Sequence, residues 1–144
     1  MRTGQYKIQK RVGNSQVSLN IKLNIYMHRN DQSRKAKPIP KIKGQFDSHP
    51  YFNELQNGID YAITELPDYF GEYIETVRII DFDLETNENI SGLAEYGACM
   101  ALFNAFQYEP FNPPIYIFSN PAIHYPYDSY GAFECAVQID QKGY

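Results

Sequence analysis

Apolar and polar residues alternate without an error between positions 16 and 27 of the chain. The apolar members of this pattern are Val17, Leu19, Ile21, Leu23, Ile25 and Met27. A period of two places alternate side chains on opposite faces of a β-strand, so we expect one buried face and one wet face. The turn signal Gly13-Asn14 precedes this segment, and residues 5–12 alternate more weakly. The pattern therefore predicts two strands separated by a turn.

Helical spacing of apolar residues from Tyr51 to Leu66 predicts a helix with Pro50 in its first turn. Asp47 and Ser48 are suitable N-terminal caps, and Pro67 stops the helix. Gly58 lies in the interior, where glycine weakens a helix by about 1 kcal/mol relative to alanine. We therefore expect a neighbouring backbone to approach Gly58 closely.

A second helix is predicted over residues 92–107, which are apolar nearly all round. Ser91 or Asn89 is the expected cap, and Pro110 ends the helix. A helix with so little polar surface belongs at the centre of a fold, and its small residues let it lie close to a sheet. Cys99, in the middle of this helix, is expected to be buried.

Four further segments are predicted strands: residues 39–46, 74–84, 115–118 and 133–139. The predicted order is βββαβαββ, with no internal repeat and no linker. We therefore predict an α+β fold in which two helices cover one face of a mostly antiparallel sheet. Residues 1–144 are expected to form a single globular domain.

The composition limits the class of protein. The chain is 43% hydrophobic and 15% aromatic, which excludes a disordered chain. The first ten residues lack the apolar core of a signal peptide, and no run approaches the roughly 18 apolar residues of a membrane span. We therefore expect a cytoplasmic protein that makes no membrane contact. Cys99 and Cys135 suit that compartment as small buried hydrophobic residues.

Charge is distributed unevenly along the chain. Residues 1–43 hold eleven Lys and Arg against one acid, a net charge of +10, whereas residues 44–144 hold two basic residues against sixteen acids, a net charge of −14. Such asymmetry is typical of a chain that meets charged partners: nucleic acid for a basic strip, or a basic protein for an acidic body. The alternative is that the basic segment packs against the acidic one within the fold.

Three carboxylates, Asp81, Asp83 and Glu85, fall on one face of a predicted strand. Such a trio is able to hold Mg²⁺ or Ca²⁺, as in a metal-dependent hydrolase. We favour the alternative of a solvated strand face that runs into an acidic turn, because no lysine or histidine stands nearby in sequence to complete a catalytic set.

No other group of residues supports catalysis. His28, His49 and His124 are scattered without metal-binding spacing, and Cys99 sits in the most apolar helix. The nucleophile elbow, the P-loop and the dinucleotide-binding motif are absent. We therefore expect no catalytic residue, no metal site and no cofactor, and a protein that is not an enzyme.

Residues 53–106 resemble the middle of domain four of elongation factor G, in the broad fold family with a left-handed βαβ crossover. That family places a helix with a Gly-Ile…Ala pattern, a short loop, a hydrophobic strand, a tip turn and a helix of small residues in this order. The matching residues are Gly58, Ile59, Ala62, Val77, Ile79, Ser91, Ala94, Ala98 and Ala101. The GTPase module is absent, and the tip from Thr86 to Asn89 is acidic where ribosomal RNA would prefer basic groups. The resemblance implies this fold and a non-catalytic binding role, and it carries over no partner.

These patterns favour a protein-binding module that docks onto a basic protein, such as a toxin or a nucleic-acid-binding enzyme. An acidic inhibitor or a toxin-neutralising immunity protein is the concrete form of this hypothesis. Acidic residues would steer the partner and tyrosines of the proline-rich segment would anchor it. The expected contact residues are Asp83, Glu85, Glu88, Tyr125, Tyr127 and Tyr130. The first alternative is an RNA- or ribosome-associated module that binds through residues 1–43, and the second is the metal-dependent hydrolase.

Overall fold

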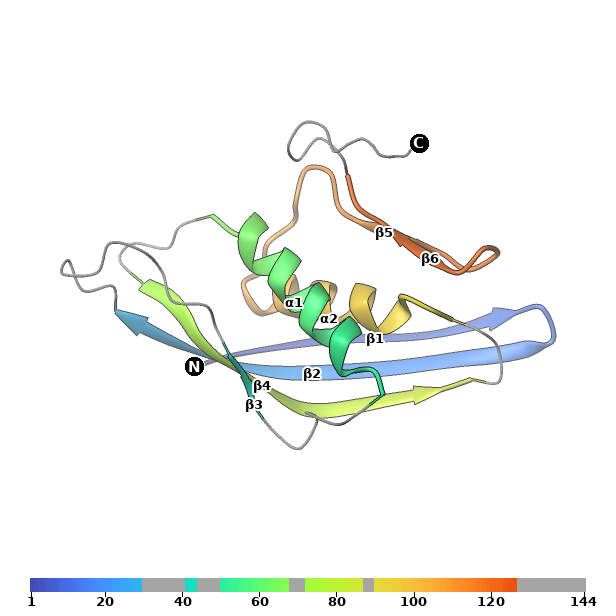
Figure 1. Cartoon of the computed structure of the whole chain (residues 1–144), viewed down its shortest axis with the longest axis horizontal. Helices are drawn as coiled ribbons and strands as arrows, with labels where there is room; N and C mark the ends of the chain where they lie inside the picture. Colours follow the sequence, from blue (N-terminus) through green and yellow to red (C-terminus); the bar gives the residue numbers. More distant parts are fainter. Residues whose placement is uncertain (30–40, 44–49, 68–71, 87–89, 127–144) are drawn as a thin grey trace.

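The computed structural model describes residues 1–29, 41–43, 50–67, 72–86 and 90–126 of the chain. Two helices lie against a long, twisted sheet, and a short hairpin lies beyond the helices (Figure 1). The elements are β1 (Arg2–Val12), β2 (Ser15–Arg29), β3 (Lys41–Lys43), α1 (Phe52–Glu65), β4 (Glu72–Glu85), α2 (Leu93–Ala105), β5 (Ile115–Ile117) and β6 (Ala122–His124). The predicted α+β class and the order βββαβαββ are confirmed.

The last strand of this order is not the one that the sequence predicted. β6 lies at Ala122–His124, inside a segment interpreted as a proline-rich loop, and the strand predicted over residues 133–139 lies outside the described residues. β6 is three residues long and directly follows Pro121. So short a segment shows no periodicity, which is why the pattern of residues did not reveal it.

The main sheet has the strand order β1-β2-β4-β3. β1 and β2 form an antiparallel hairpin across Gly13-Asn14, which confirms the predicted turn; Gly13 has a φ of 63°, a conformation that favours glycine. β2 also pairs antiparallel with β4, and β3 pairs parallel with β4. α1 connects β3 to β4, as a parallel pair requires.

The alternation along β2 decides where the core lies. Val17, Leu19, Ile21, Leu23 and Ile25 are at most 1% exposed, and both helices lie on their side of the sheet (Figure 1). This confirms the predicted buried face and the cover by two helices. Neither helix is long and apolar enough to cross a membrane, as far as the described residues go.

Two glycines let helices approach a neighbouring backbone. A Cβ atom at Gly58 of α1 would lie 2.1 Å from the carbonyl oxygen of Glu95 on α2, so the predicted close approach is confirmed. At Gly4 of β1, a Cβ atom would lie 2.0 Å from the carbonyl oxygen of Ala101. α2 is therefore packed between α1 and β1, in the central position that its apolar sequence predicted.

The cap of α2 differs from the prediction. The N-cap residue is Gly92, in the left-handed region, and no side chain forms a cap hydrogen bond there, so Ser91 does not have the predicted role. Asn89, the other expected cap, lies outside the described residues. Instead, the backbone N–H of Gly92 donates a hydrogen bond of 3.1 Å to the carboxylate of Glu54 on α1. A carboxylate from the neighbouring helix thus binds the backbone at the start of α2, which short-range patterns cannot predict.

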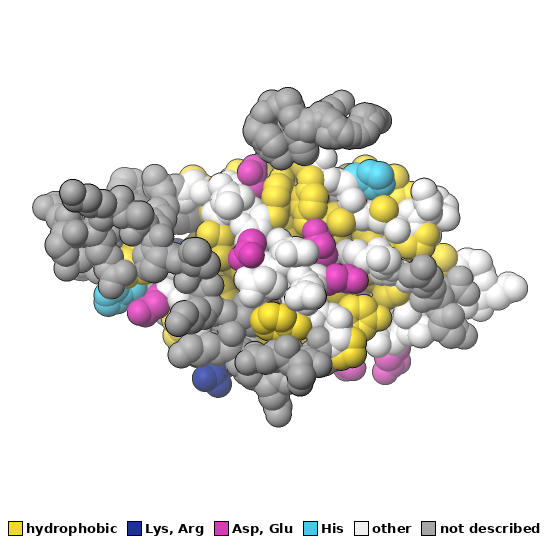
Figure 2. Space-filling model, in the orientation of Figure 1, with side chains coloured by type: hydrophobic (Ala, Val, Ile, Leu, Met, Phe, Trp, Pro, Cys, Tyr) yellow, Lys and Arg dark blue, Asp and Glu magenta, His cyan; other side chains and the backbone are white. Residues whose placement is uncertain are grey.

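The hairpin of β5 and β6 is a separate two-stranded sheet that packs on α2. The Tyr116 hydroxyl donates a hydrogen bond of 2.7 Å to the carbonyl oxygen of Ser91, and the Tyr116 ring contacts those of Tyr96 and Phe118. The opposite side chains of β5, Ile115 and Ile117, are 53% and 37% exposed. Hydrophobic side chains are accordingly visible where this hairpin lies (Figure 2).

Candidate functional site

The sheet has one face covered by helices and one face over which no described element lies. We call the second the open face. Its side chains come from alternate residues of three strands. They are Thr3, Gln5, Lys7, Gln9 and Arg11 of β1, Gln16, Ser18, Asn20, Lys22, Asn24 and Tyr26 of β2, and Thr76, Arg78, Asp81, Asp83 and Glu85 of β4. The predicted solvent-facing side of the alternating strand is therefore confirmed, and it belongs to a three-strand surface.

Charges are sorted across the open face. The register places Lys7, Asn20 and Asp83 side by side on β1, β2 and β4. Lys7 and Arg11 thus project from the outer strand β1, and the acids Asp81, Asp83 and Glu85 occupy the last part of β4, after Arg78. In the next row, Lys22 of β2 stands directly opposite Asp81. The basic N-terminal strands and the acidic strand are therefore neighbours in one sheet, as the hypothesis of internal packing expects.

Hydrogen bonds between side chains hold the middle of the open face. The Gln5 amide donates to the Asn20 side-chain oxygen at 2.7 Å, and the Thr3 hydroxyl donates to the Asn24 side-chain oxygen at 2.9 Å. Asp83 and Glu85 are exposed and form no hydrogen bond or ion pair with another described residue. The acids are therefore available to a partner, whereas the amides beside them are already oriented.

A shallow hollow of roughly 460 Å³ lies at the turn end of the open face. Its lining residues come from β1, β2, β4 and the residue that follows β4; they are Gln9, Gln16, Ser18, Glu85 and Thr86. Glu85 supplies one carboxylate, and the other residues supply amide and hydroxyl oxygens. A guanidinium group fits this chemistry, because it donates several planar N–H groups and pairs well with a carboxylate.

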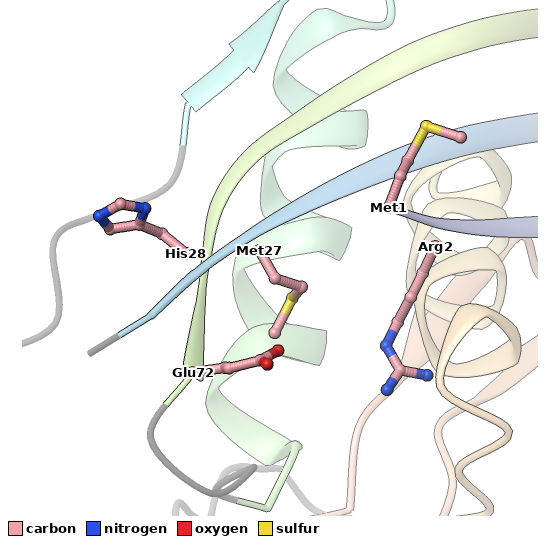
Figure 3. Close-up of a pocket in the computed structure, with 5 residues that line it drawn as sticks. All are labelled: Met1, Arg2, Met27, His28 and Glu72. Carbon is pink, nitrogen blue, oxygen red and sulfur yellow. The ribbon is translucent and has the colours of Figure 1, made fainter.

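A second hollow, of roughly 540 Å³, lies at the opposite end of the strands (Figure 3). Met1, Arg2, Met27, His28 and Glu72 line it, and the ring of His28 points away from the other four side chains. The guanidinium carbon of Arg2 lies 4.7 Å from the centre of the Phe106 ring, so this cation is already engaged. The described residues around this hollow do not converge as a set of groups for a reaction.

The structure separates the residues that the sequence assigned to one binding surface. Asp83 and Glu85 lie on the open face, whereas Tyr125 lies against the helices on the other side of the sheet. The Tyr125 ring centre is 4.2 Å from that of Tyr61 on α1, and its hydroxyl donates a hydrogen bond to the carboxylate of Glu95 on α2. The other three predicted contact residues, Glu88, Tyr127 and Tyr130, lie outside the described residues.

Glu95 is a half-buried carboxylate on α2 that was not among the residues predicted to form a site. Burial raises its pKa above the ordinary value of 4.5, and the hydrogen bonds from Tyr125 and Asn57 only partly oppose this. Burial and the neighbouring Glu95 carboxylate also raise the pKa of Tyr125. One signal was present in the sequence: Glu95 is the only charged residue in the apolar segment 92–107.

The catalytic candidates among the described residues do not assemble into a site. Cys99 is fully buried, and burial raises the pKa of its thiol, so it is unsuited to act as a nucleophile. Asp81, Asp83 and Glu85 do share one strand face, but no three acidic, histidine or cysteine side chains are grouped to hold a metal ion within the described ranges. His49 lies outside those ranges.

Comparisons with known proteins do not assign this geometry to a family. No family model matches the chain, and no curated protein matches it.

Proposed function

We propose that the protein is a non-enzymatic protein-binding module that docks its open face onto a basic partner. An acidic inhibitor or an immunity-type protein that neutralises a toxin or a nucleic-acid-binding enzyme is the specific form of this proposal. The observation that carries it is the exposed acidic row of β4, Asp81, Asp83 and Glu85, on a sheet face that no described element covers.

The sorted charges favour a protein partner over nucleic acid. Strands in a sheet lie about 4.8 Å apart, so Lys7 and Asp83, two strands apart, are separated by roughly 10 Å. This exceeds the Debye length of about 8 Å at physiological ionic strength, so salt largely screens a phosphate at Lys7 from Asp83. A phosphate backbone that continues across the face would nevertheless meet the carboxylates of Asp81 and Asp83 directly. A protein surface is able to match both signs, and interfaces of mixed polarity are common in protein complexes.

The two parts of the acidic surface have different expected roles. Exposed acids such as Asp83 mainly raise the association rate by steering a basic partner. Glu85, in the hollow at the turn end, is placed to receive an arginine side chain of the partner, which would slow dissociation. Tyr125 is left out of this surface, because its hydroxyl and ring are already engaged with α1 and α2.

Charge reversal on the open face tests the proposal. The partner is first captured from cell extract with the full chain and identified, and its association and dissociation rates are then measured with purified proteins. We expect Asp83→Lys to slow association and to weaken its salt dependence, and Glu85→Lys to speed dissociation as well. Glu109→Lys is the matched control, because Glu109 is also exposed but lies outside the sheet. If all three variants bind like the wild type, the acidic row is not the docking surface.

One observation favours an RNA- or ribosome-associated module as the second candidate. Lys7, Arg11 and Lys22 all project from the open face, together with Tyr26, which is 36% exposed and able to stack on a base. The resemblance of residues 53–106 to domain four of elongation factor G implies the same non-catalytic class. Filter binding at low salt distinguishes the two candidates. Retention of RNA that falls steeply with salt supports the second candidate, and its absence removes it.

A further inference from the structure

β1 is an edge strand, and one hydrogen bond shows which of its backbone groups face outward. The side-chain amide of Asn104 on α2 donates a hydrogen bond of 2.8 Å to the carbonyl oxygen of Gln5. In an antiparallel strand, alternate residues turn both their N–H and their C=O to the same side. The outward-facing residues of β1 are therefore Thr3, Gln5, Lys7, Gln9 and Arg11, while the residues between them pair with β2.

α2 covers only the first half of this edge. It touches β1 at Gly4 and caps the Gln5 carbonyl, but no backbone hydrogen bond to another described residue reaches β1 from its outer side. The outward N–H and C=O groups of Lys7, Gln9 and Arg11 are therefore unpaired within the described part of the chain. An edge of this kind is a template for one more strand.

The charges on β1 decide which strand fits. Lys7 and Arg11 project from the open face beside that edge, and Lys10 projects from the other face. A second copy of β1 would place like charges next to each other, which destabilises cross-strand pairs. An added strand with acidic residues on the open face would instead pair with Lys7 and Arg11. On the helix side, the half-buried Ile8 and Val12 offer apolar neighbours.

We propose that the outer edge of β1, from Lys7 to Val12, binds an extended acidic segment of a partner protein in which acids alternate with apolar residues. The sheet already contains such a strand. In β4, Asp81 and Asp83 alternate with Phe82 and Leu84, and β4 pairs with β2 so that Asp81 stands opposite Lys22. The proposed segment would repeat this pairing on the far side of the hairpin. It goes beyond the proposed function, because the edge of β1 is distinct from the acidic row.

A short fluorescent peptide in which glutamate and aspartate alternate with valine is a direct probe for the full-length protein. We expect the peptide to bind the wild type, with an affinity that falls as salt is added, whereas a peptide with lysine in place of the acids does not bind. N-methylation of the peptide's edge-facing amides should weaken binding about tenfold or more, because each lost hydrogen bond leaves a partner unsatisfied. Fluorescence anisotropy measures all three affinities.

Two proline variants locate the contact on the protein. Gln9→Pro removes an outward N–H without touching the ladder to β2, and we expect it to weaken peptide binding about tenfold or more. Thr3→Pro also removes an outward N–H, but in the half that α2 covers, and it should bind the peptide like the wild type. Reversing both charges with Lys7→Glu and Arg11→Glu should transfer the preference to the lysine peptide.

The remaining outcomes overturn the proposal. No binding of the acidic peptide would do so, and so would equal binding of the N-methylated peptide, which would mean attraction of charge without strand pairing. A dimer of the protein that Gln9→Pro dissolves, seen by analytical ultracentrifugation, would show that a second copy occupies the edge. If Gln9→Pro does not fold, the comparison of the parent and N-methylated peptides on the wild type still decides the question.

Discussion

Replacing Gly58 by alanine tests the helix contact at the centre of the fold, because local and tertiary effects have opposite signs there. In a helix interior, alanine is more favourable than glycine by about 1 kcal/mol. In this structure the new Cβ atom would lie 2.1 Å from the carbonyl oxygen of Glu95 and 3.2 Å from the Cβ atom of Ala98. Cβ atoms essentially never approach another heavy atom within 3.0 Å, so the two helices would have to separate by close to an ångström.

The expected net effect is a loss of stability. Overpacking in a well-packed core typically costs about 1–3 kcal/mol, and a backbone carbonyl is harder to move than a side chain, so we take the upper end. Subtracting the helix-propensity gain of about 1 kcal/mol leaves a destabilisation of about 2 kcal/mol. Urea unfolding followed by far-ultraviolet circular dichroism measures this change in the free energy of unfolding.

Gly97→Ala is the matched control in the other helix. Its Cβ atom would lie 2.6 Å from the Leu19 side chain and 2.8 Å from the tip of Ile21. Because these are flexible side-chain ends, they are able to rotate away, and we expect a loss below about 1 kcal/mol. If Gly58→Ala is as stable as the wild type, or more stable, the close crossing of α1 and α2 is refuted.

Two further predictions concern the sheet and the half-buried carboxylate. Leu23→Ala should lower the free energy of unfolding, measured in urea, by about 2–5 kcal/mol, because Leu23 is fully buried. Asn24→Ala on the open face should lower it by less than about 1 kcal/mol. Equal losses would contradict the assignment of the two faces. The folded-state pKa of Glu95 is raised above 4.5, so ionisation opposes folding, and the wild type should lose stability relative to Glu95→Gln as pH rises from below 4.5 to neutrality. Unfolding curves measured at several pH values check this, and a stability difference independent of pH would show that Glu95 titrates alike in both states.

Local patterns in the sequence predicted the parts of the fold that depend on local physics. The hairpin of β1 and β2 follows from the period of two and from Gly13-Asn14, and the position of α2 follows from its apolar composition. The face on which Asp83 and Glu85 lie also followed from alternation alone. Alternation does not predict which strands become neighbours in the sheet. The side-by-side position of Lys7, Asn20 and Asp83 is therefore known only from the structure.

The predicted contact at Tyr125 likewise shows that local patterns do not reveal contacts between distant parts of the chain. Tyr125 has the composition and proline-rich context of an interface residue, and nothing local indicates that its hydroxyl binds Glu95, thirty positions earlier in the chain. The cap of α2 is a second example, because Glu54 reaches it from α1. Both contacts depend on how closely the helices and the C-terminal segment approach, which is a property of the folded core.

The order of the elements along the chain also sets when each one becomes available during synthesis. β1 and β2 are adjacent in the chain and close a short loop, whereas β4 begins at Glu72 and α2 at Leu93. N-terminal segments emerge from the ribosome first, so β1 and β2 are both synthesised before the helices that cover their apolar side. A nascent chain at this stage would expose the apolar row of β2 and two strand edges, which is a hazard for aggregation. The basic side chains of residues 1–29 would then repel those of other nascent chains and so oppose aggregation. This effect does not depend on a binding partner.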